Sequence, residues 1–392
     1  MRLLHRHLLV NSAMIHQAMA SSADDVGVVW LPPYHDMGLI GGLLQPLYAG
    51  YPVHLMAPAT FLQRPLRWLE TISRLRGTVS AAPNFAYELC ARRLKPEQVA
   101  SLDLSSWRLA ANGAEPIRQR TLSVFSQVFA AAGFDASAFA PCYGMAETTL
   151  LVAASAPDAA PVILRADRQA LLGGTVQPAT GDDAVVLVSS GTPAAGACVV
   201  IADPQRLEVL PPGQVGEIWV AGPMVADGYW NSPQATEANF HATLEGGQHS
   251  WLRTGDLGAL LEGQLYVTGR LKDVIIIHGH NHYPTDLEDT VGKLDVAIRP
   301  QGVAAYAREL GGEEALGLVV EVERNLAETA LAALRARIVE AVSQVHQLRV
   351  GELLLVAPNS LPRTSSGKLQ RARTRQAVEE GTLQALAGRA QP

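Results

Sequence analysis

Apolar residues in the first part of the chain form short runs that alternate with helical patterns. Residues 26–31 are rich in valine and end at Pro32 and Pro33, so we expect a buried strand that leads into a loop. Residues 65–75 place their leucines and isoleucine on one face, which predicts a helix. Further strands are expected over residues 51–56, 78–82 and 107–111. Strands that alternate with helices indicate a parallel sheet covered on both faces.

The pattern changes after about Asp183, where short strands separated by turn residues predominate. The strands expected there cover residues 184–188, 198–202, 215–220 and 264–268. They predict a small β-barrel-like subdomain or an antiparallel sheet packed on the first part. A compact junction at 269–272 is followed by an α+β segment with a helix over 326–345. The expected fold is therefore α/β: a large domain of mostly parallel sheets, helices and this subdomain, then a small α+β domain.

The first residues carry basic side chains and a short apolar run, as a signal peptide does. The run from Leu8 to Val10 is too short for such a peptide, and Asn11 and Ser12 follow at once. The spacing of the nearby apolar residues fits an amphipathic helix better. These residues are Leu4, Leu8, Met14 and Ile15.

Composition narrows the function classes. The chain has 392 residues, 48% of them hydrophobic, which suits a compact protein with a large core. A net charge of -6 predicts no bulk attraction to nucleic acid or anionic lipid. No run of about 18 apolar residues occurs, so we expect no membrane span. Three scattered cysteines argue against a disulfide framework or a cysteine-rich zinc site and favour a cytoplasmic protein.

Five polar segments could carry chemistry. In 143–148, YGMAET, a tyrosine could stack on a purine base and a carboxylate could hold magnesium on a nucleotide phosphate. The alternative is a plain strand-to-helix turn. In 112–116, NGAEP, the glycine would let backbone approach a ligand, or the segment is an ordinary turn with proline at a helix start. In 251–257, WLRTGDL, the aspartate could accept both ribose hydroxyl groups, or it is a β-turn residue.

Two segments lie further along the chain. GRLKD, at 269–273, precedes an apolar strand and could be a charged, solvated turn. PRTSSGK, at 362–368, presents a lysine on a flexible loop. It is not a Walker A motif, because Pro362 stands where that motif has glycine and Leu369 follows the lysine.

Taken in order, these segments resemble the adenylate-forming enzymes. The matching blocks are PPYHDMGL at 32–39, NGAEP at 112–116, YGMAET at 143–148, GEIWVAG at 216–222, RTGDL at 253–257, GRLKD at 269–273 and PRTSSGK at 362–368. The sequences around these blocks, together with the long connection over about 151–190, are most similar to those of the fatty acyl-AMP ligases. In that subfamily an insertion at this point restrains the C-terminal domain and disfavours release to coenzyme A.

The resemblance implies domains, reaction and partners. It implies a truncated AMP-binding domain over 1–268 with the insertion at about 151–190, a hinge at 269–272 and a mobile C-terminal domain over 273–392. The implied reaction joins a fatty acid to ATP, with magnesium, giving acyl-AMP. The acyl group then passes to an acyl carrier protein or to a carrier domain of a polyketide or nonribosomal peptide synthase.

Residue roles follow from the matching positions. Lys368 would bridge the carboxylate and the α-phosphate, and Glu147 would hold magnesium. Lys272 would be the pivot of C-terminal domain rotation. The positions implied in nucleotide binding are Asn112, Gly113, Ala114, Glu115, Tyr143, Gly144, Met145, Ala146, Asp256 and Arg270. Those implied at the acyl pocket are His35, Asp36, Met37 and Gly38.

The sequence departs from the family at the front. The family's Gly/Ser/Thr-rich phosphate loop, just before the helix that here begins near Leu3, is absent with roughly the first third of the family's chain. We therefore expect little acyl-AMP formation by this chain alone. A non-catalytic remnant that binds AMP or acyl-AMP and an acyl-CoA ligase are the alternatives. A metal site at His278, His280 and His282 is a further, minor one.

A basic tail is expected to help dock an acidic carrier protein. After Leu361 the positive residues are Arg363, Lys368, Arg371, Arg373, Arg375 and Arg389, against Glu379 and Glu380. The alternative is a solvated basic helix.

Overall fold

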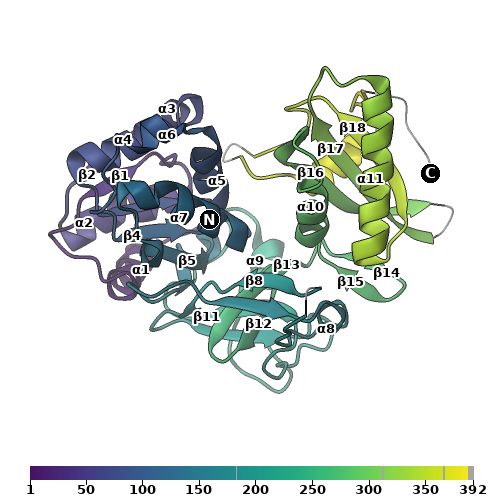
Figure 1. Cartoon of the computed structure of the whole chain (residues 1–392). Helices are drawn as coiled ribbons and strands as arrows, with labels where there is room; N and C mark the ends of the chain where they lie inside the picture. The colour runs from purple at the N-terminus through teal and green to yellow at the C-terminus, as the bar shows by residue number, and fades with distance from the viewer. Residues whose placement is uncertain (182, 311–312, 365–366, 387–392) are drawn as a thin grey trace. The chain divides into compact units, whose positions relative to one another are not determined.

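The computed structural model describes residues 1–181, 183–310, 313–364 and 367–386. It divides into two compact units, shown with their elements in Figure 1. The first unit comprises Met1–Ala166 and Val186–Thr268. The second comprises Asp167–Val185 and Gly269–Pro392, so the middle of the long 151–190 connection belongs with the C-terminal part of the chain.

A seven-stranded sheet forms the centre of the first unit. Its order is β2 (Val53–Leu55), β1 (Gly27–Val29), β3 (Val79–Ala82), β4 (Leu109–Asn112), β5 (Phe139–Gly144), β6 (Leu151–Ala154) and β9 (Thr192–Pro193). The pairings from β2 to β5 are parallel. Those of β5 with β6 and of β6 with β9 are antiparallel. The expected α/β fold with a mostly parallel sheet is confirmed.

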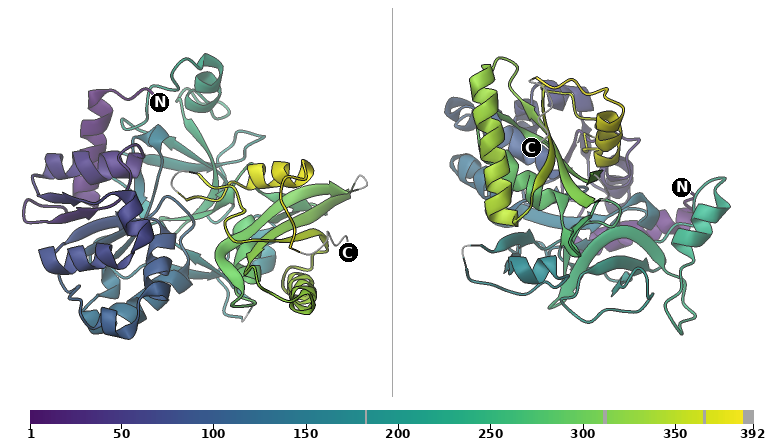
Figure 2. Two further views of the ribbon diagram at one scale, coloured as in Figure 1. Left: turned by 90° about the horizontal axis from the view of Figure 1, so that it is seen from above. Right: turned by 90° about the vertical axis from the view of Figure 1, so that its right-hand side faces the viewer.

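Helices cover both faces of this sheet (Figure 2). Ala110 and Phe139 pack into one core with α4 (Leu66–Leu75), α5 (Asn84–Arg93) and α7 (Gln119–Phe129). Their neighbours Leu109 and Ala140 pack into another with α1 (His5–Ala18) and the π-helix η1 (Met37–Leu44). Successive strand residues point to opposite faces, so the two cores lie on opposite sides of the sheet. The remaining helices of this unit are α2 (Gln45–Ala49), α3 (Pro58–Gln63), α6 (Pro96–Val99), η2 (Ala130–Ala132), η3 (Ala136–Ala138), η4 (Ala146–Thr148) and α9 (Pro233–Phe240).

The second sheet of this unit has four strands. Its order is β10 (Cys198–Ala202), β11 (Gly216–Ala221), β12 (Leu252–Leu261) and β13 (Gln264–Arg270). The pairings of β10 with β11 and of β11 with β12 are antiparallel, so the antiparallel-sheet alternative is confirmed. The β-barrel-like alternative is wrong, because these strands form an open sheet. Ile201, Ile218 and Leu265 pack into the core that holds α1. A separate pair is formed by β7 (Ile163–Ala166) and β8 (Val185–Val188).

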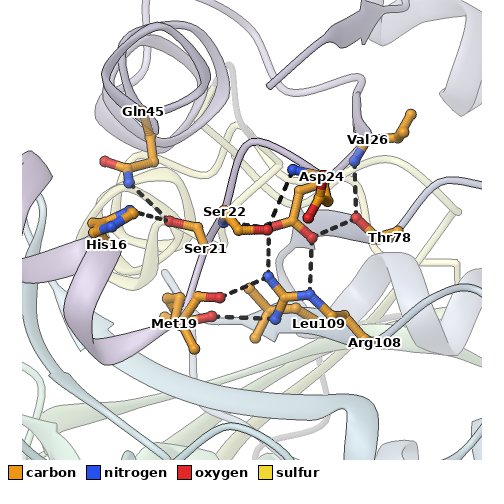
Figure 3. Close-up of polar contacts among 12 residues, drawn as sticks. His16, Met19, Ser21, Ser22, Asp24, Val26, Gln45, Thr78, Arg108 and Leu109 are labelled. Carbon is orange, nitrogen blue, oxygen red and sulfur yellow. Dashed lines mark hydrogen bonds and ion pairs between the residues drawn. The ribbon is translucent and has the colours of Figure 1, made fainter. Parts of the chain in front are cut away.

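An ion pair between a buried carboxylate and a partly exposed arginine ties α1 to the parallel sheet, among the contacts drawn in Figure 3. Arg108 donates from Nε and Nη2 to the carboxylate of Asp25, at 2.8 and 2.5 Å. It also donates to the carbonyl oxygens of Met19 and Ala20, at the C-terminal end of α1. Thr78 Oγ1 donates to Asp25 at 2.7 Å. One carboxylate and one guanidinium group therefore connect the end of α1 to the starts of β3 and β4.

The second unit has its own sheet and core. Its sheet order is β16 (Ile298–Leu310), β17 (Glu313–Val322) and β18 (Val350–Val356). The helix expected over 326–345 is α11 (Glu328–His346), which buries a stripe of residues three or four apart: Leu331, Leu334, Ile338 and Val342. The other elements are α8 (Arg168–Leu172), the hairpin of β14 (Ile275–Ile277) and β15 (His280–His282), α10 (Pro284–Gly292) and α12 (Arg371–Glu379). In the part of the chain that the structure describes, no helix has the length and apolar character needed to cross a membrane.

The 167–185 segment is attached to the rest of the second unit by charge. Arg168 pairs with Asp286 of α10 and, at 3.1 Å, with Asp183. His346 Nδ1 lies 3.7 Å from the same Asp286. His282 lies beside them, 4% exposed, and its Nδ1 has no hydrogen-bond partner among the described residues. A neutral imidazole is therefore buried between charged neighbours.

We expect Asp25→Asn to lower the free energy of unfolding by about 1.5–3 kcal/mol, since it removes the buried charge that accepts hydrogen bonds from Arg108. Although burial raises the pKa of Asp25, hydrogen bonds from Arg108, Thr78 and Ser22 outweigh it and hold that pKa below its usual value. The contribution is therefore complete above about pH 4 and is lost as pH falls through the folded-state pKa. Urea unfolding at several pH values measures it. The exposed neighbour Asp24→Asn is the control, and equal effects of the two changes would contradict the assignment.

We expect His282→Phe to reduce the loss of stability in weak acid. Burial, then the nearby His346, His280 and His278, lowers the pKa of His282 to about 4. The unfolded chain takes up a proton below about pH 6.5 and the folded chain does not, so stability falls from pH 6.5 towards pH 4. The full shift corresponds to roughly 3–3.5 kcal/mol, of which somewhat more than half is lost by pH 5. Urea unfolding at pH 7.5 and pH 5 should show a smaller difference for His282→Phe than for the exposed His54→Phe, which lies in the first unit and is not among the groups that shift His282. An unchanged difference would refute this.

Candidate active site

The structure brings Tyr143 and Asp256 together, although 113 residues separate them. Tyr143 Oη donates to Asp256 Oδ2 at 2.9 Å, and each residue is 8% exposed. Tyr143 lies near the end of β5 in the parallel sheet. Asp256 lies in β12 of the antiparallel sheet. The YGMAET and RTGDL segments therefore contribute to one site within the first unit.

Asp256 lies within a strand, so the β-turn alternative for this segment is wrong. The strand-to-helix alternative for 143–148 also fails. There, β5 ends at Gly144, and the chain continues through Met145 and a single 3₁₀ turn that starts at Ala146, then returns antiparallel as β6. The structure shows a hairpin whose connecting turn is buried or half-buried.

The NGAEP segment starts at the last residue of β4, next to β5. Asn112 is fully buried, and neither atom of its side-chain amide has a hydrogen-bond partner among the described residues. Burying such an amide without a partner is costly, so it requires one that a bound water or a ligand can supply. Ala114 has a φ of +68°, a conformation that costs a non-glycine residue energy and that other described residues, such as Arg76 and Glu262, also adopt.

Gly113 and Glu115 have structural roles that the sequence did not suggest. A Cβ at Gly113 would lie 2.8 Å from Sγ of Cys142, so packing against β5 already requires glycine. The Glu115 carboxylate accepts from the backbone N–H of Phe85 at 2.5 Å, in the first turn of α5. Pro116 does not start a helix, because α7 begins only at Gln119.

Glu147 lies in the 3₁₀ turn after Tyr143. Its Oε1 accepts from Oη of Tyr229 at 2.9 Å, and its backbone oxygen accepts from the N–H of Ala226. Burial, followed by the charge of Glu147, raises the pKa of Tyr229 to about 12, so this phenol remains a neutral donor. Tyr229 belongs to the GYW segment at 228–230, and sequence reasoning gave it no role. Among the described residues, no three His, Cys, Asp or Glu side chains are grouped to hold a metal ion.

The residues implied at the acyl pocket lie at the N-terminal end of a helix. Asp36 is the N-cap of the π-helix η1, and its Oδ1 accepts from the N–H of Met37 at 2.7 Å. The same oxygen lies 2.7 Å from Nδ1 of His35. Gly38 packs directly on the carbonyl oxygen of Pro32. π-Helices are rare overall, and those that occur often lie at functional sites.

The remaining implied residues belong to the second unit. Arg270 ends β13, and Lys272 lies in the turn before β14. Lys368 lies between β18 and α12, where its N–H donates to Oγ1 of Thr364 and its carbonyl oxygen accepts from the N–H of Thr364. Ser365 and Ser366 lie outside the described residues.

Two positive residues of the basic tail, Arg371 and Arg375, are paired with carboxylates of the second unit. Arg371 donates from Nε and Nη2 to the Glu288 carboxylate, both at 2.7 Å, and also pairs with Asp273. Arg375 pairs with Glu379 one turn later in α12. The tail therefore offers less free charge for a carrier protein than the sequence suggested. Arg389 lies outside the described residues.

Known proteins match both parts of the chain. Residues 3–230 match the family model described as AMP-binding enzyme, and residues 272–387 match that of the Disco-interacting protein 2-like AMP domain. A medium-chain-fatty-acid–[acyl-carrier-protein] ligase of Moorena producens is 46% identical over 97% of this chain. The chain spans 65% of that relative's length.

Solved structures agree. One from studies of fatty acyl-adenylate ligases of E. coli and L. pneumophila has a TM-score of 0.89 at 34% identity, covering 97% of this chain and 67% of that one. The L. pneumophila ligase in complex with acyl adenylate and pyrophosphate has a TM-score of 0.70 at 40% identity, covering 99% and 68%. Since the first family model alone matches more than half of the chain, the chain belongs to the AMP-binding, adenylate-forming enzymes.

Proposed function

We propose that this chain carries the adenylate-binding part of an enzyme that activates a fatty acid as acyl-AMP and passes the acyl group to a carrier protein. The observation that carries the proposal is the contact between Tyr143 and Asp256 beside the NGAEP segment. It places an aromatic ring and a carboxylate in one site, which suits a base and a ribose diol. The similarity to ligases of fatty acids supports the substrate class.

Each group in the first unit has a role in this proposal. The ring of Tyr143 stacks on adenine, and the Asp256 carboxylate accepts from the two ribose hydroxyl groups. The unpartnered Asn112 amide and the backbone of 113–115 line the base, and Gly144, Met145 and Ala146 form the turn beneath it. His35, Asp36, Met37 and Gly38 shape the entrance for the acyl chain.

The residues present fit a magnesium ion that is bound mainly by the nucleotide. Magnesium commonly takes one or two protein carboxylates and fills its other positions with phosphate oxygens and water. Glu147 supplies one carboxylate. Tyr229 donates to its Oε1, which leaves Oε2 available to the ion. The ion would neutralise phosphate charge, and Tyr229 would hold the carboxylate in place.

Residues of the second unit complete the proposal. Lys368 bridges the attacking carboxylate and the α-phosphate and stabilises their developing charge. Arg270 binds the ribose, and Lys272 is the pivot for movement of the C-terminal domain over 273–392.

The free cysteines Cys90, Cys142 and Cys198 suit a reducing cytoplasm.

The chain should bind AMP or a non-hydrolysable acyl-sulfamoyl-adenosine, and Asp256→Ala should weaken binding about 10–100-fold. A hydrogen bond to a charged group contributes about 1.5–3 kcal/mol, which gives that range. Isothermal titration calorimetry on folded, monodisperse protein measures it, with Asp24→Ala as the control on an exposed aspartate. A folded chain that binds neither ligand would refute the proposal.

Given chemically prepared acyl-AMP, the chain should load a phosphopantetheinylated acyl carrier protein faster than coenzyme A. We expect a ratio of at least about tenfold, equivalent to about 1.4 kcal/mol in the transition state. Mass spectrometry of the two thioesters after equal times gives the ratio, with boiled protein as the control for spontaneous transfer. Equal rates would instead support an acyl-CoA ligase, and no enzyme-dependent transfer would support a non-catalytic binding protein.

A further inference from the structure

The RTGDL segment is a bulge in the middle of a strand. Across β11 and β12, Glu217 faces Leu257 and Trp219 faces Arg253. In β11, only Ile218 lies between Glu217 and Trp219. In β12, the three residues 254–256 lie between Arg253 and Leu257. Two extra residues are therefore inserted in β12, and Asp256 is one of the three that form the bulge. Bulges of this kind redirect a side chain out of the regular strand pattern.

A bulge removes backbone groups from the strand pairing, and Glu217 supplies a replacement partner. The N–H of Gly255 donates to Glu217 Oε1 at 3.1 Å. Gly255 has a φ of +71°, a conformation that suits glycine. The N–H of Asp256 donates to Oγ1 of Thr254 at 3.1 Å, and that hydroxyl group donates to the carbonyl oxygen of Ile218 at 2.6 Å. Side chains thus fix the backbone on both sides of the bulge.

The Glu217 carboxylate is itself held rigidly. It is 2% exposed, and Oε2 accepts from Arg253 at 2.9 Å from Nε and 2.7 Å from Nη2. The indole N–H of Trp219 donates to the same oxygen at 2.9 Å. The Arg253 guanidinium group lies over the Trp219 ring, 5.3 Å from its centre. These donors around the buried carboxylate all come from β11 or β12, so its position is fixed relative to the bulge.

We propose that Glu217 is a positioning residue for ribose binding: it holds the Thr254–Asp256 bulge so that the Asp256 carboxylate meets Tyr143 and the diol of an adenylate. This rests on the proposed function, because it concerns the same site. Glu217 and Arg253 do not touch the nucleotide in this account. They act through Asp256, so their effect depends on a ligand with ribose hydroxyl groups and on an intact Asp256.

The test compares the affinities of Glu217→Gln for AMP and for 2′,3′-dideoxy-AMP, measured by calorimetry. The glutamine side chain would keep the size of the glutamate and lose the charge that binds Arg253. We expect AMP affinity to fall about tenfold or more and dideoxy-AMP affinity to stay within about twofold of wild type. In an Asp256→Asn background the same change should have no further effect on AMP affinity, as a double-mutant cycle detects. The exposed Glu208→Gln is the matched control.

The outcomes separate the two proposals. If the wild-type chain binds AMP and folded Glu217→Gln binds it equally well, the positioning role is wrong and the proposed function stands. If Glu217→Gln weakens both nucleotides equally, or acts equally in the Asp256→Asn background, its role is general folding and the inference is overturned. If the wild-type chain binds no adenylate, both fail. Should Glu217→Gln not fold, Glu217→Asp keeps the charge but draws the carboxylate back from Gly255, and the same selective loss is expected.

Discussion

The hydrogen bond from Tyr143 to Asp256 joins the two sheets of the first unit, and the rest of the candidate site is arranged around it. Tyr143 lies one residue before the end of β5, and Asp256 lies in the bulge at 254–256 of the antiparallel sheet. Packing of Ile201, Ile218 and Leu265 into the core beneath α1 fixes the distance between the sheets. The site is thus a consequence of how the two sheets meet.

Much of the fold could be predicted from the sequence, because the strands that it identified are short apolar runs. The runs at 26–31, 78–82 and 198–202 became β1, β3 and β10 with ends shifted by at most two residues. The bulge in β12 was not foreseen, since two extra residues break the alternation by which a strand is recognised. β5 was missed because Pro141 and Gly144 interrupt its apolar pattern.

The sequence predicted the site as a set of separate segments. It did not show which of these segments contact each other, and the structure does. Glu217 of GEIWVAG and Arg253 of RTGDL were each part of a matching block without a role, and they pair with each other. The opposite charges of these two residues, in two matching blocks, were the only sequence signal that could have suggested the pair. The basic tail shows the reverse error: counting charges treated Arg371 as free, whereas Glu288 and Asp273 neutralise it.

The anchoring of α1 has a consequence for the order of events during synthesis. Arg108 lies 83 residues beyond Asp25, the Asn11 amide pairs with the backbone of Leu151, and the N–H of Arg2 donates to Gly228. At about 5–20 residues per second, the ribosome needs roughly 10–45 s to make the 226 residues that separate Arg2 from Gly228. The helix α1 is therefore translated long before its last partner, and it becomes fully fixed only after that partner has been made. Its apolar face stays open to chaperones or to unwanted association throughout that interval.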